Sequence, residues 1–414
     1  MNNKLYAYLE KTISRSDYLK DFDSFVFSPF IKILVWARRV GKSYFLYQVI
    51  KKLLEQKVFD ENHIFYVNKE WLEFDEITDY KSLYKLFLDW KRESKVWDKF
   101  FVWIDEVQEI ETWQKFILSV WSEYPESIIF ITWSNSKLLS KDIWTQLRWR
   151  YISKRIFPLT LKEFLEFKKI ELSDEVFNEY IKFWWLPATT FIDDESIKSE
   201  YLKWVYNTIF VKDLLEYEKI RNPNLLKTIH KFLFKEIWNL INGKNIVNYL
   251  KSQWVKTSVE TVLNYIEFSQ NAFLFDEVLR YDIRWKKIFE TTKKYYSFDL
   301  WVRNAIVGIN LKNDIWWIYE NLVYNYLKVK GYDVYVGVFY DKEIDFIAEK
   351  NWEKIYIQVA YLLPDEDTIQ REFWNLLKIR DGRRKIVISW DKFPIKKYEG
   401  IEHINIVDFL QMDL

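Results

Sequence analysis

The chain has 414 residues, enough for about two to four domains of roughly 100 to 200 residues each. Its 62 lysines and arginines balance 61 aspartates and glutamates, so the net charge of +1 indicates neither a nucleic acid nor an anionic membrane as a partner. There is no cysteine, which excludes disulfides and thiol catalysis, and the 3 histidines lack metal-ligand spacing, so any metal ion should be held by oxygen.

The N-terminal part predicts an α/β fold of the P-loop NTPase type. A short apolar strand, "KILV", leads through a loop into "SYFLYQVIKKLLEQ", whose apolar residues have helical period. Further strands are expected at His63–Asn68, Phe101–Asp105 and Ser127–Thr132, and "RYISKRIFPLTLKEFLEF" predicts a last strand and a helix. Strands that alternate with helices indicate a parallel sheet with helices on both faces.

The remaining chain predicts three more parts. Residues from about 160 to 235 are mostly helical in pattern. "NIVNYLKSQWVKTSVETVLNYIEFSQN" indicates two helices joined by a turn, the second capped by Thr257 and Ser258, and the β-rich segment after it would supply a wing. From about residue 312 the pattern is one helix and three strands, which indicates a small closing α/β portion.

No secretion signal and no run of about 18 apolar residues occurs in the sequence. We therefore expect a soluble cytoplasmic protein without a membrane partner.

A nearly complete phosphate-binding pattern lies between the first strand and the first long helix. It reads W-x-x-x-x-G-K-S, with Trp36 in the place of the first glycine. Gly41 permits close approach of the backbone, Lys42 would contact the β- and γ-phosphates of ATP, and the Ser43 hydroxyl would bind Mg²⁺. The predicted nucleotide site comprises Trp36, Ala37, Arg38, Arg39, Val40, Gly41, Lys42, Ser43 and Tyr44.

An acidic pair about 60 residues later completes the predicted ATP site. In "FVWIDEVQ", Asp105 and Glu106 end an apolar strand. Asp105 would hold the magnesium ion, and Glu106 would orient or deprotonate the attacking water. A solvated acidic pair at the end of an ordinary strand is the alternative.

Polar residues further along are candidates for the γ-phosphate end of the site. Ser134 and Asn135 follow the strand "SIIFIT". Arg148 and Arg150 are candidates for stabilising transition-state charge, in the same chain or in a neighbouring subunit of a homo-oligomer, and plain surface arginines are the alternative.

Tryptophan is in excess where glycine is short. The chain has 7 glycines and 22 tryptophans, which together match the roughly 29 glycines expected at this length. Trp352 follows Asn351 in a tight link between strands, and Trp254 follows a helix where a left-handed residue is expected. We hypothesise that many of these codons are UGA, which some bacterial lineages read as glycine. The alternative is a protein that is simply rich in tryptophan. At Trp113, which lies on an apparent helix face, the two explanations fit equally well.

"ARRVGKS", "IDEVQ", "SNSKLLS", "LRWRYISKRIFPLTLKEF" and "FWWLPA" together resemble the AAA-type ATPases of bacteria and archaea that carry a fused C-terminal domain of unknown function. The resemblance covers nearly the whole chain. It implies ATP binding and hydrolysis, and in that family positions 36, 133, 149, 184 and 185 correspond to glycines.

The last segment resembles the restriction-endonuclease-like fold, in which a helix glutamate, a strand aspartate and an E-x-K motif hold Mg²⁺ and activate water. Glu320 and Asp345 match the first two, but Gln358 to Ala360 replace E-x-K. The departure implies weak or absent cleavage. A plain hairpin with a solvated edge is the alternative.

Four parts are therefore expected: a P-loop ATPase domain (1–160), a helical region (161–235), a winged-helix-like domain (236–311) and a restriction-endonuclease-like domain (312–414). The main hypothesis is an Mg²⁺-dependent ATPase that moves a DNA- or protein-binding C-terminal half. One alternative is a DNA-binding or nuclease-related protein with regulatory ATP. Another is a nucleotide-binding interaction module with little turnover. The expected recognition helix, Ser258–Ser269, has few basic residues, so DNA and protein partners are weighed equally.

Overall fold

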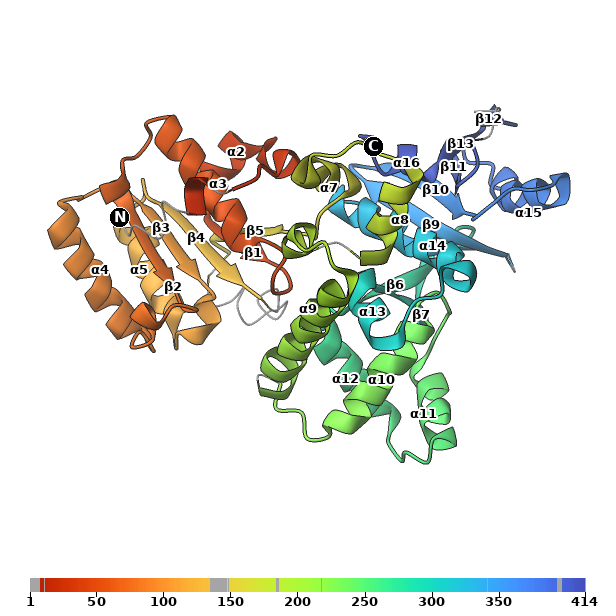
Figure 1. Ribbon diagram of the computed structural model, residues 1–414, viewed down its shortest axis with the longest axis horizontal. Coiled ribbons are helices and arrows are strands. Elements are labelled where there is room, and N and C mark those ends of the chain that lie inside the picture. The colour runs from red at the N-terminus through yellow and green to blue at the C-terminus, as the bar shows by residue number, and fades with distance from the viewer. Residues whose placement is uncertain are drawn as a thin grey trace. The chain divides into compact units, whose positions relative to one another are not determined.

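The structure, a computed structural model, describes residues 8–10, 12–134, 147, 149–183, 186–216, 218–340, 342–392 and 397–413. The chain divides into two units, Met1–Pro158 and Leu159–Leu414 (Figure 1). Each unit contains its own β-sheet with helices packed against it, so the predicted α/β class is confirmed.

A five-stranded parallel sheet forms the centre of the first unit. Its strands lie in the order β2-β3-β4-β1-β5. Every residue of β1, β3 and β4 is buried, whereas the edge strand β5 is largely half-exposed. Continuous apolar strands of this kind require cover on both faces. The strand bounds are β1 Ile31–Val35, β2 Ile64–Asn68, β3 Phe101–Asp105, β4 Ile128–Trp133 and β5 Tyr151–Arg155, which confirms the strands expected from the sequence.

The helices of the first unit connect these strands. The Asp79 carboxylate caps α4 by accepting from the Ser82 N–H at 2.8 Å, and the Ser82 hydroxyl closes a capping box. The bounds are α2 Phe22–Val26, α3 Lys42–Glu55, α4 Tyr80–Ser94 and α5 Trp113–Glu123, with short 3₁₀ turns at Ser16–Leu19, Glu61–His63, Leu72–Phe74 and Val107–Glu109.

The second unit begins with helices and ends with a mixed sheet. Its helices before the sheet are α7 Leu161–Lys168, α8 Asp174–Phe183, α9 Glu195–Thr208, α10 Pro223–Lys235, α11 Gly243–Ser252 and α12 Val259–Asn271, with a 3₁₀ turn at Pro187–Phe191. A π-helical segment, Ile209–Glu216, continues α9. The later helices are α13 Leu300–Val307, α14 Leu311–Val329, α15 Glu366–Leu377 and α16 Ile406–Phe409.

The sheet of the second unit has eight strands in the order β12-β13-β11-β10-β9-β8-β6-β7. Their bounds are β6 Phe275–Asp282, β7 Lys287–Ser297, β8 Asp333–Phe339, β9 Lys342–Lys350, β10 Glu353–Val359, β11 Arg384–Ser389, β12 Lys397–Tyr398 and β13 Ile401–Asn405. β6 pairs with β8 in parallel, so the hairpin expected as a wing shares a sheet with the segment expected to be nuclease-like. The finer division of this unit stays a prediction.

Helix α14 lies at the centre of the larger core of the second unit. Its residues Ile318, Leu322, Val323 and Leu327 are fully buried in that core. Residues 317–327 are all buried, so this helix is enclosed on every side rather than along one apolar stripe. The nuclease-like candidate Glu320 is on the same helix, so it is carried into the protein interior.

The helix-turn-helix outline matches α11 and α12. Ser258 caps α12, because its hydroxyl accepts from the Thr261 N–H at 3.1 Å. The antiparallel hairpin of β6 and β7 follows. These elements have the predicted positions, but the winged-helix assignment and its DNA contact stay predictions.

Several tryptophans adopt the left-handed backbone conformation that favours glycine. Trp352 has a φ of 70° and, with Asn351 at 50°, forms the two-residue turn between β9 and β10. Trp254 has a φ of 61° after α11, where its N–H donates to the Lys251 carbonyl and the Val255 N–H donates to the Leu250 carbonyl. Those two bonds define a Schellman cap, whose left-handed residue is usually glycine.

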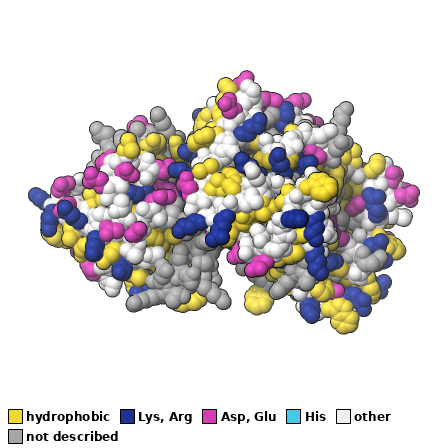
Figure 2. All heavy atoms as spheres, turned by 90° about the horizontal axis from the view of Figure 1, so that it is seen from below, with side chains coloured by type: hydrophobic (Ala, Val, Ile, Leu, Met, Phe, Trp, Pro, Cys, Tyr) yellow, Lys and Arg dark blue, Asp and Glu magenta, His cyan; other side chains and the backbone are white. Residues whose placement is uncertain are grey.

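Figure 2 shows basic and acidic side chains interspersed over the face that it displays, in line with the balanced composition. Among the described residues, no helix is both long and apolar enough to cross a membrane. The expected cytoplasmic location stays a prediction.

His230 joins three helices of the second unit from within the core. Its ring is fully buried, with Nδ1 2.9 Å from the Tyr206 hydroxyl and Nε2 2.7 Å from the Ser269 hydroxyl. Burial lowers the pKa of His230 to about 3, so the ring is neutral near pH 7.

We expect this histidine to make the second unit acid-sensitive. The pKa of His230 is about 3 in the folded chain and about 6.5 when unfolded, so the unfolded state binds more protons between these values. The free energy of unfolding should therefore fall as pH is lowered through 6.5, by about 2 kcal/mol at pH 5 from this group alone. Urea unfolding at pH 7 and pH 5 measures this change in the free energy of unfolding. The His230→Asn variant should show a smaller change between the two pH values. An equal dependence in both proteins would contradict the assignment.

Candidate functional site

The loop between β1 and α3 is organised around the Lys42 side chain. Gly41 has a φ of 94°, a left-handed conformation in which a side chain would be strained, and α3 begins at the next residue. The Lys42 Nζ donates to the Trp36 carbonyl at 2.8 Å, to the Ala37 carbonyl at 3.0 Å and to the Ser134 hydroxyl at 2.9 Å. The lysine therefore links the loop to the end of β4.

The acidic pair lies at the carboxyl end of β3, and β4 separates β3 from β1. The Ser43 hydroxyl nevertheless donates to the Asp105 Oδ2 at 2.6 Å. The Thr132 hydroxyl of β4 donates to the other carboxylate oxygen of Asp105 and accepts from the Glu106 N–H at 2.9 Å. The fold thus brings the loop serine and the strand aspartate together, as the sequence predicted, with β4 as the bridge.

Glu106 is held on all sides by hydrogen bonds and positive charges. Its Oε1 accepts from the Ser134 hydroxyl and is 3.8 Å from the Lys42 Nζ. Its Oε2 accepts from the Gln108 side-chain amide at 2.5 Å and is 3.8 Å from the Arg38 Nη1. The residue also has a left-handed φ of 54°, which turns the chain sharply after the strand.

The two neighbouring carboxylates have opposite pKa shifts. Burial is the larger cause that raises the pKa of Asp105 to about 6, and the negative charge of Glu106 is the second. The hydrogen bonds from Ser43 and Thr132 act in the opposite direction and lower this pKa. For Glu106, burial opposes ionisation, but the charges of Lys42 and Arg38 outweigh it and lower the pKa of that carboxyl. Glu106 therefore loses its proton more readily than Asp105, and a group that accepts a proton must be ionised beforehand.

The oxygen atoms of Ser43 and Asp105 suit a magnesium ion. One hydroxyl and one carboxylate oxygen lie 2.6 Å apart, and hard oxygen donors of this kind, completed by water and phosphate, are what Mg²⁺ prefers. The described residues contain no group of three or more histidine or acidic side chains arranged to hold a metal. Any ion here would therefore depend on phosphate and water for its other ligands.

The other loop residues support or flank the site. Trp36 is buried, with its ring centroid 4.3 Å from that of Phe157. The carbonyl of buried Val40 accepts from the Arg15 guanidinium at 3.3 Å, and Arg39 has a left-handed φ of 69°. Tyr44 is exposed on α3 beside Tyr47.

Of the arginine and asparagine candidates, the structure describes Arg150. Asn135 and Arg148 lie outside the described residues. The Arg150 carbonyl accepts from the Ile31 N–H at the start of β1, and its guanidinium is 4.7 Å from the centre of the Trp121 ring. Because the loop follows the other end of this five-residue strand, about 15 Å away, a role for Arg150 within its own chain is not supported. A role in a neighbouring subunit stays a prediction.

Two supporting residues were missed by the sequence reading. Thr132 is a polar residue within the apolar run "SIIFITW", and that interruption was the available signal. Arg15 is buried and donates to the carbonyls of Val40 and Pro158, but nothing in its local sequence distinguishes it from a surface arginine.

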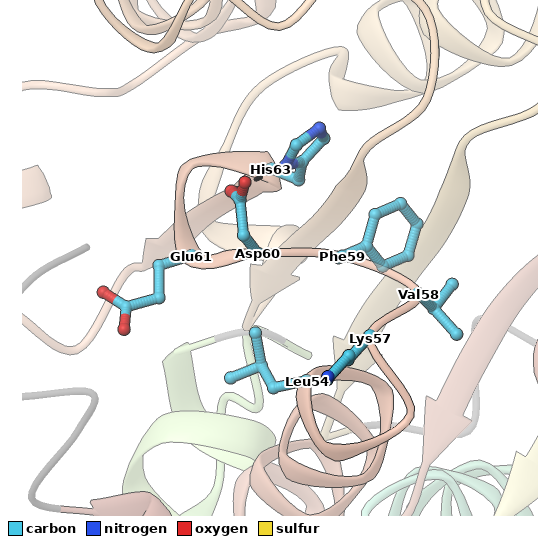
Figure 3. A pocket seen from close by; sticks show the side chains of 7 residues that line it. All are labelled: Leu54, Lys57, Val58, Phe59, Asp60, Glu61 and His63. Atoms are coloured by element: carbon cyan, nitrogen blue, oxygen red, sulfur yellow. Dashed lines mark hydrogen bonds and ion pairs between the residues drawn. The ribbon is translucent and has the colours of Figure 1, made fainter.

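A pocket at the far end of α3 is separate from this site (Figure 3). Its most specific contact joins the His63 Nδ1 and the Asp60 Oδ1 at 2.7 Å. It is lined by Leu54, Lys57, Val58, Phe59, Asp60, Glu61 and His63. Since the loop is at the start of α3 and these residues lie in its last turn or after it, the pocket takes no part in the predicted ATP site.

In the second unit the nuclease-like candidates come together. Asp345 on β9 and Glu320 on α14 are both buried and close enough for the charge of Glu320 to raise the pKa of Asp345, after burial as the larger cause. Gln358 on β10 lies opposite Asp345 if the pairing of Ile357 with Phe346 is continued by one residue. A lysine that the sequence reading did not single out, Lys294 on β7, is 2.9 Å from Glu320.

Comparison with known proteins extends over both units. Residues 28–165 match the AAA domain family. An uncharacterized protein of Haemophilus influenzae is 35% identical over 405 residues, which are 96% of this chain and 98% of that protein. An uncharacterized protein of Methanocaldococcus jannaschii is 33% identical over 404 residues, covering 91% and 85%. Among solved structures, a Walker-type ATPase of Pyrococcus abyssi is similar over 73% of this chain and 95% of that chain, at 14% identity and a TM-score of 0.47.

The Thr132 hydroxyl should contribute measurably to stability. Thr132→Val keeps the shape of the side chain but leaves the buried Glu106 N–H without its acceptor and removes a hydrogen bond to Asp105. We expect the free energy of unfolding in urea to fall by about 1–3 kcal/mol. Thr132→Ser, which keeps the hydroxyl, should lose less. A larger loss in Thr132→Ser than in Thr132→Val would show that the methyl group, rather than the hydroxyl, matters here.

Proposed function

Because this chain belongs to the AAA-domain P-loop ATPase family, we propose that it binds ATP together with Mg²⁺ and hydrolyses ATP to ADP and phosphate. The observation that carries the proposal is the continuous chain of contacts from Lys42 through Ser134 to Glu106. It joins the residue type that binds phosphate to the residue type that activates water.

The loop residues supply the binding part of the reaction. Gly41 allows the backbone to approach the phosphates, and the N-terminal end of α3 adds positive partial charge there. Lys42 would exchange its loop carbonyl partners for phosphate oxygens, which are charged and form stronger hydrogen bonds. Ser43 and Asp105 would hold a magnesium ion, which neutralises phosphate charge when it is bound.

Glu106 supplies the chemical part. Its ionised carboxylate can orient a water molecule and accept its proton as the water attacks the γ-phosphate. Ser134 and Gln108 fix the direction of the carboxylate through hydrogen bonds to its two oxygens. We propose that Arg38 and Lys42 keep the group ionised despite its burial.

We propose that ATP binding and hydrolysis in the first unit move the second unit. Relatives that match across nearly the whole chain support a single working protein rather than two accidental neighbours. The proposed partner of the second unit is DNA or a protein. The competing proposal is a nucleotide-binding interaction module with little turnover, and it shares every binding residue with the ATPase.

We also propose that tryptophans 36, 133, 149, 254 and 352 stand where the native protein has glycine. Trp149, Trp254 and Trp352 have φ values of 61°, 61° and 70°, in the region that glycine enters without strain. Trp254 and Trp352 are 94% and 98% exposed, so their indoles pack against almost nothing. The indole nitrogen of buried Trp133 has no hydrogen-bond partner among the described atoms. UGG codons at 36, 133 and 352 would overturn this proposal.

ATP binding should depend on Lys42 and hydrolysis on Glu106. Lys42→Ala is expected to weaken ATP binding, measured by calorimetry, by about tenfold to a hundredfold, since it removes charged hydrogen bonds. Glu106→Gln should keep binding but lower kcat by about 10²–10⁴-fold, because the amide cannot accept a proton. The rate of ATP hydrolysis is measured as phosphate release, both in the chain with Trp36 and in the Trp36→Gly variant.

Lys91→Ala provides the matched control. Lys91 is also a buried lysine of the first unit, but its Nζ donates to the Trp97 carbonyl, away from the loop. ATP binding should survive that change. Tight binding without measurable phosphate release, both in the chain as written and with Trp36→Gly, would defeat the ATPase proposal in favour of the interaction module.

Replacing a left-handed tryptophan by glycine should stabilise the chain. Trp352→Gly relieves a backbone conformation that costs a residue with a side chain about 1–2 kcal/mol, partly offset by the flexibility of glycine when unfolded. We expect the free energy of unfolding to rise by about 1 kcal/mol. Trp374→Gly is the control of opposite sign, because exposed Trp374 lies within α15, where glycine costs about 1 kcal/mol. Destabilisation by both changes would argue for a native tryptophan at 352.

A further inference from the structure

A buried lysine occupies the cluster in which the nuclease-like resemblance would place a metal ion. The Lys294 Nζ is 2.9 Å from the Glu320 Oε1 and 2.6 Å from the Glu343 Oε1. Lys294 is 3% exposed, and Glu320 is 5% exposed. The ammonium thus lies among carboxylates with little access to water.

The side chains of this cluster come from three elements that are separate in sequence. Lys294 is on β7, Glu320 is on α14, and Glu343 and Asp345 are on β9, where they share a face because they are two residues apart. The negative charges of Glu320, Glu343 and Asp345 raise the pKa of Lys294 despite its burial, so the lysine stays protonated. Its positive charge is therefore a permanent part of the cluster.

The oxygens that a metal ion would need are already engaged. The Glu320 Oε1 accepts from the Tyr296 hydroxyl at 2.5 Å as well as from Lys294. The Asp345 Oδ2 accepts from the Val359 N–H at 2.8 Å. In the part of the chain that the structure describes, these carboxylates do not form a group that could hold a metal ion.

The residues at the positions of the E-x-K motif offer no charged ligand for a metal ion and no lysine to activate water. Gln358 is neutral, and its buried Oε1 has no hydrogen-bond partner among the described atoms. Ala360 offers no ammonium group. A divalent cation bound to Glu320 would also lie next to the Lys294 charge and be repelled by it. The residues present therefore do not fit the metal that the nuclease-like resemblance implies.

We propose that the Lys294 ammonium is the resident cation of this cluster, which excludes divalent metal ions from Glu320 and Asp345 and joins β7, α14 and β9. The second unit then performs no metal-dependent cleavage of phosphodiesters at this place. Instead, the cluster is an internal ion-pair site that keeps the edge hairpin of β6 and β7 attached to the rest of the sheet. The proposal is independent of ATP hydrolysis, which depends on the first unit.

Removing the lysine should open the site to a metal. The experiment uses the full chain carrying Asp105→Asn, so that the predicted magnesium position of the first unit does not contribute, and measures bound Mn²⁺ by electron paramagnetic resonance. The chain with Lys294 intact should bind no Mn²⁺ that depends on Asp345. Adding Lys294→Met should create one Mn²⁺ site per chain, and a further Asp345→Asn should abolish it.

Lys198→Met is the matched control, because Lys198 is likewise 3% exposed and its Nζ is 2.9 Å from the Glu179 Oε1 in the same unit. It should create no Mn²⁺ site. If Lys294→Met does not fold, Lys294→Gln keeps a hydrogen-bond donor at the position, and its unfolding temperature should rise on addition of Mn²⁺ while that of the chain with Lys294 intact should not. Asp345-dependent Mn²⁺ binding with Lys294 in place, or no gain on its removal, would overturn the proposal.

Discussion

Two adjacent carboxylates buried at the end of one strand are the constraint on which the first unit depends. Asp105 and Glu106 are 3% and 7% exposed, and neighbouring negative charges in a protein interior repel each other while both have lost water. Charges about 4 Å apart near a protein surface interact by about 4 kcal/mol, so uncompensated repulsion of that size would threaten a marginally stable fold. The compensation comes from the hydroxyls of Thr132 in β4 and of Ser134 directly after it, and from the positive charges of Arg38 and Lys42.

The strand order makes this compensation geometrically available. Because β4 lies between β1 and β3, Thr132 and Ser134, two residues apart and therefore on one face, reach both the loop and the acidic pair. Thr132 supports Asp105, and Ser134 connects Lys42 to Glu106. The same contacts that make burial of the pair tolerable also position its members for the proposed chemistry, so stability and function depend on the same side chains.

The second unit solves a similar problem in another way. Glu320 and Asp345 also bring acidic groups into the interior, but their counter-charge is the covalently attached ammonium of Lys294. In the first unit the positive charges belong to a loop that can exchange carbonyl partners for phosphate. In the second unit the lysine is buried within the core and needs no outside ligand. The difference explains why one acidic pair suits a ligand site and the other suits an internal ion pair.

The sequence by itself determined the local features: the strands and helices of the first unit, the loop lysine, the acidic pair and the positions where tryptophan sits in glycine-like turns. These follow from periodicity, short motifs and turn chemistry, which act over a few residues. Only the tertiary structure decided which distant residues meet. It placed Thr132 between Asp105 and Glu106, put Arg150 at the end of β1 opposite the loop, and brought Lys294 to Glu320 and Glu343. Such contacts depend on strand order and helix packing, which no local pattern in one sequence specifies.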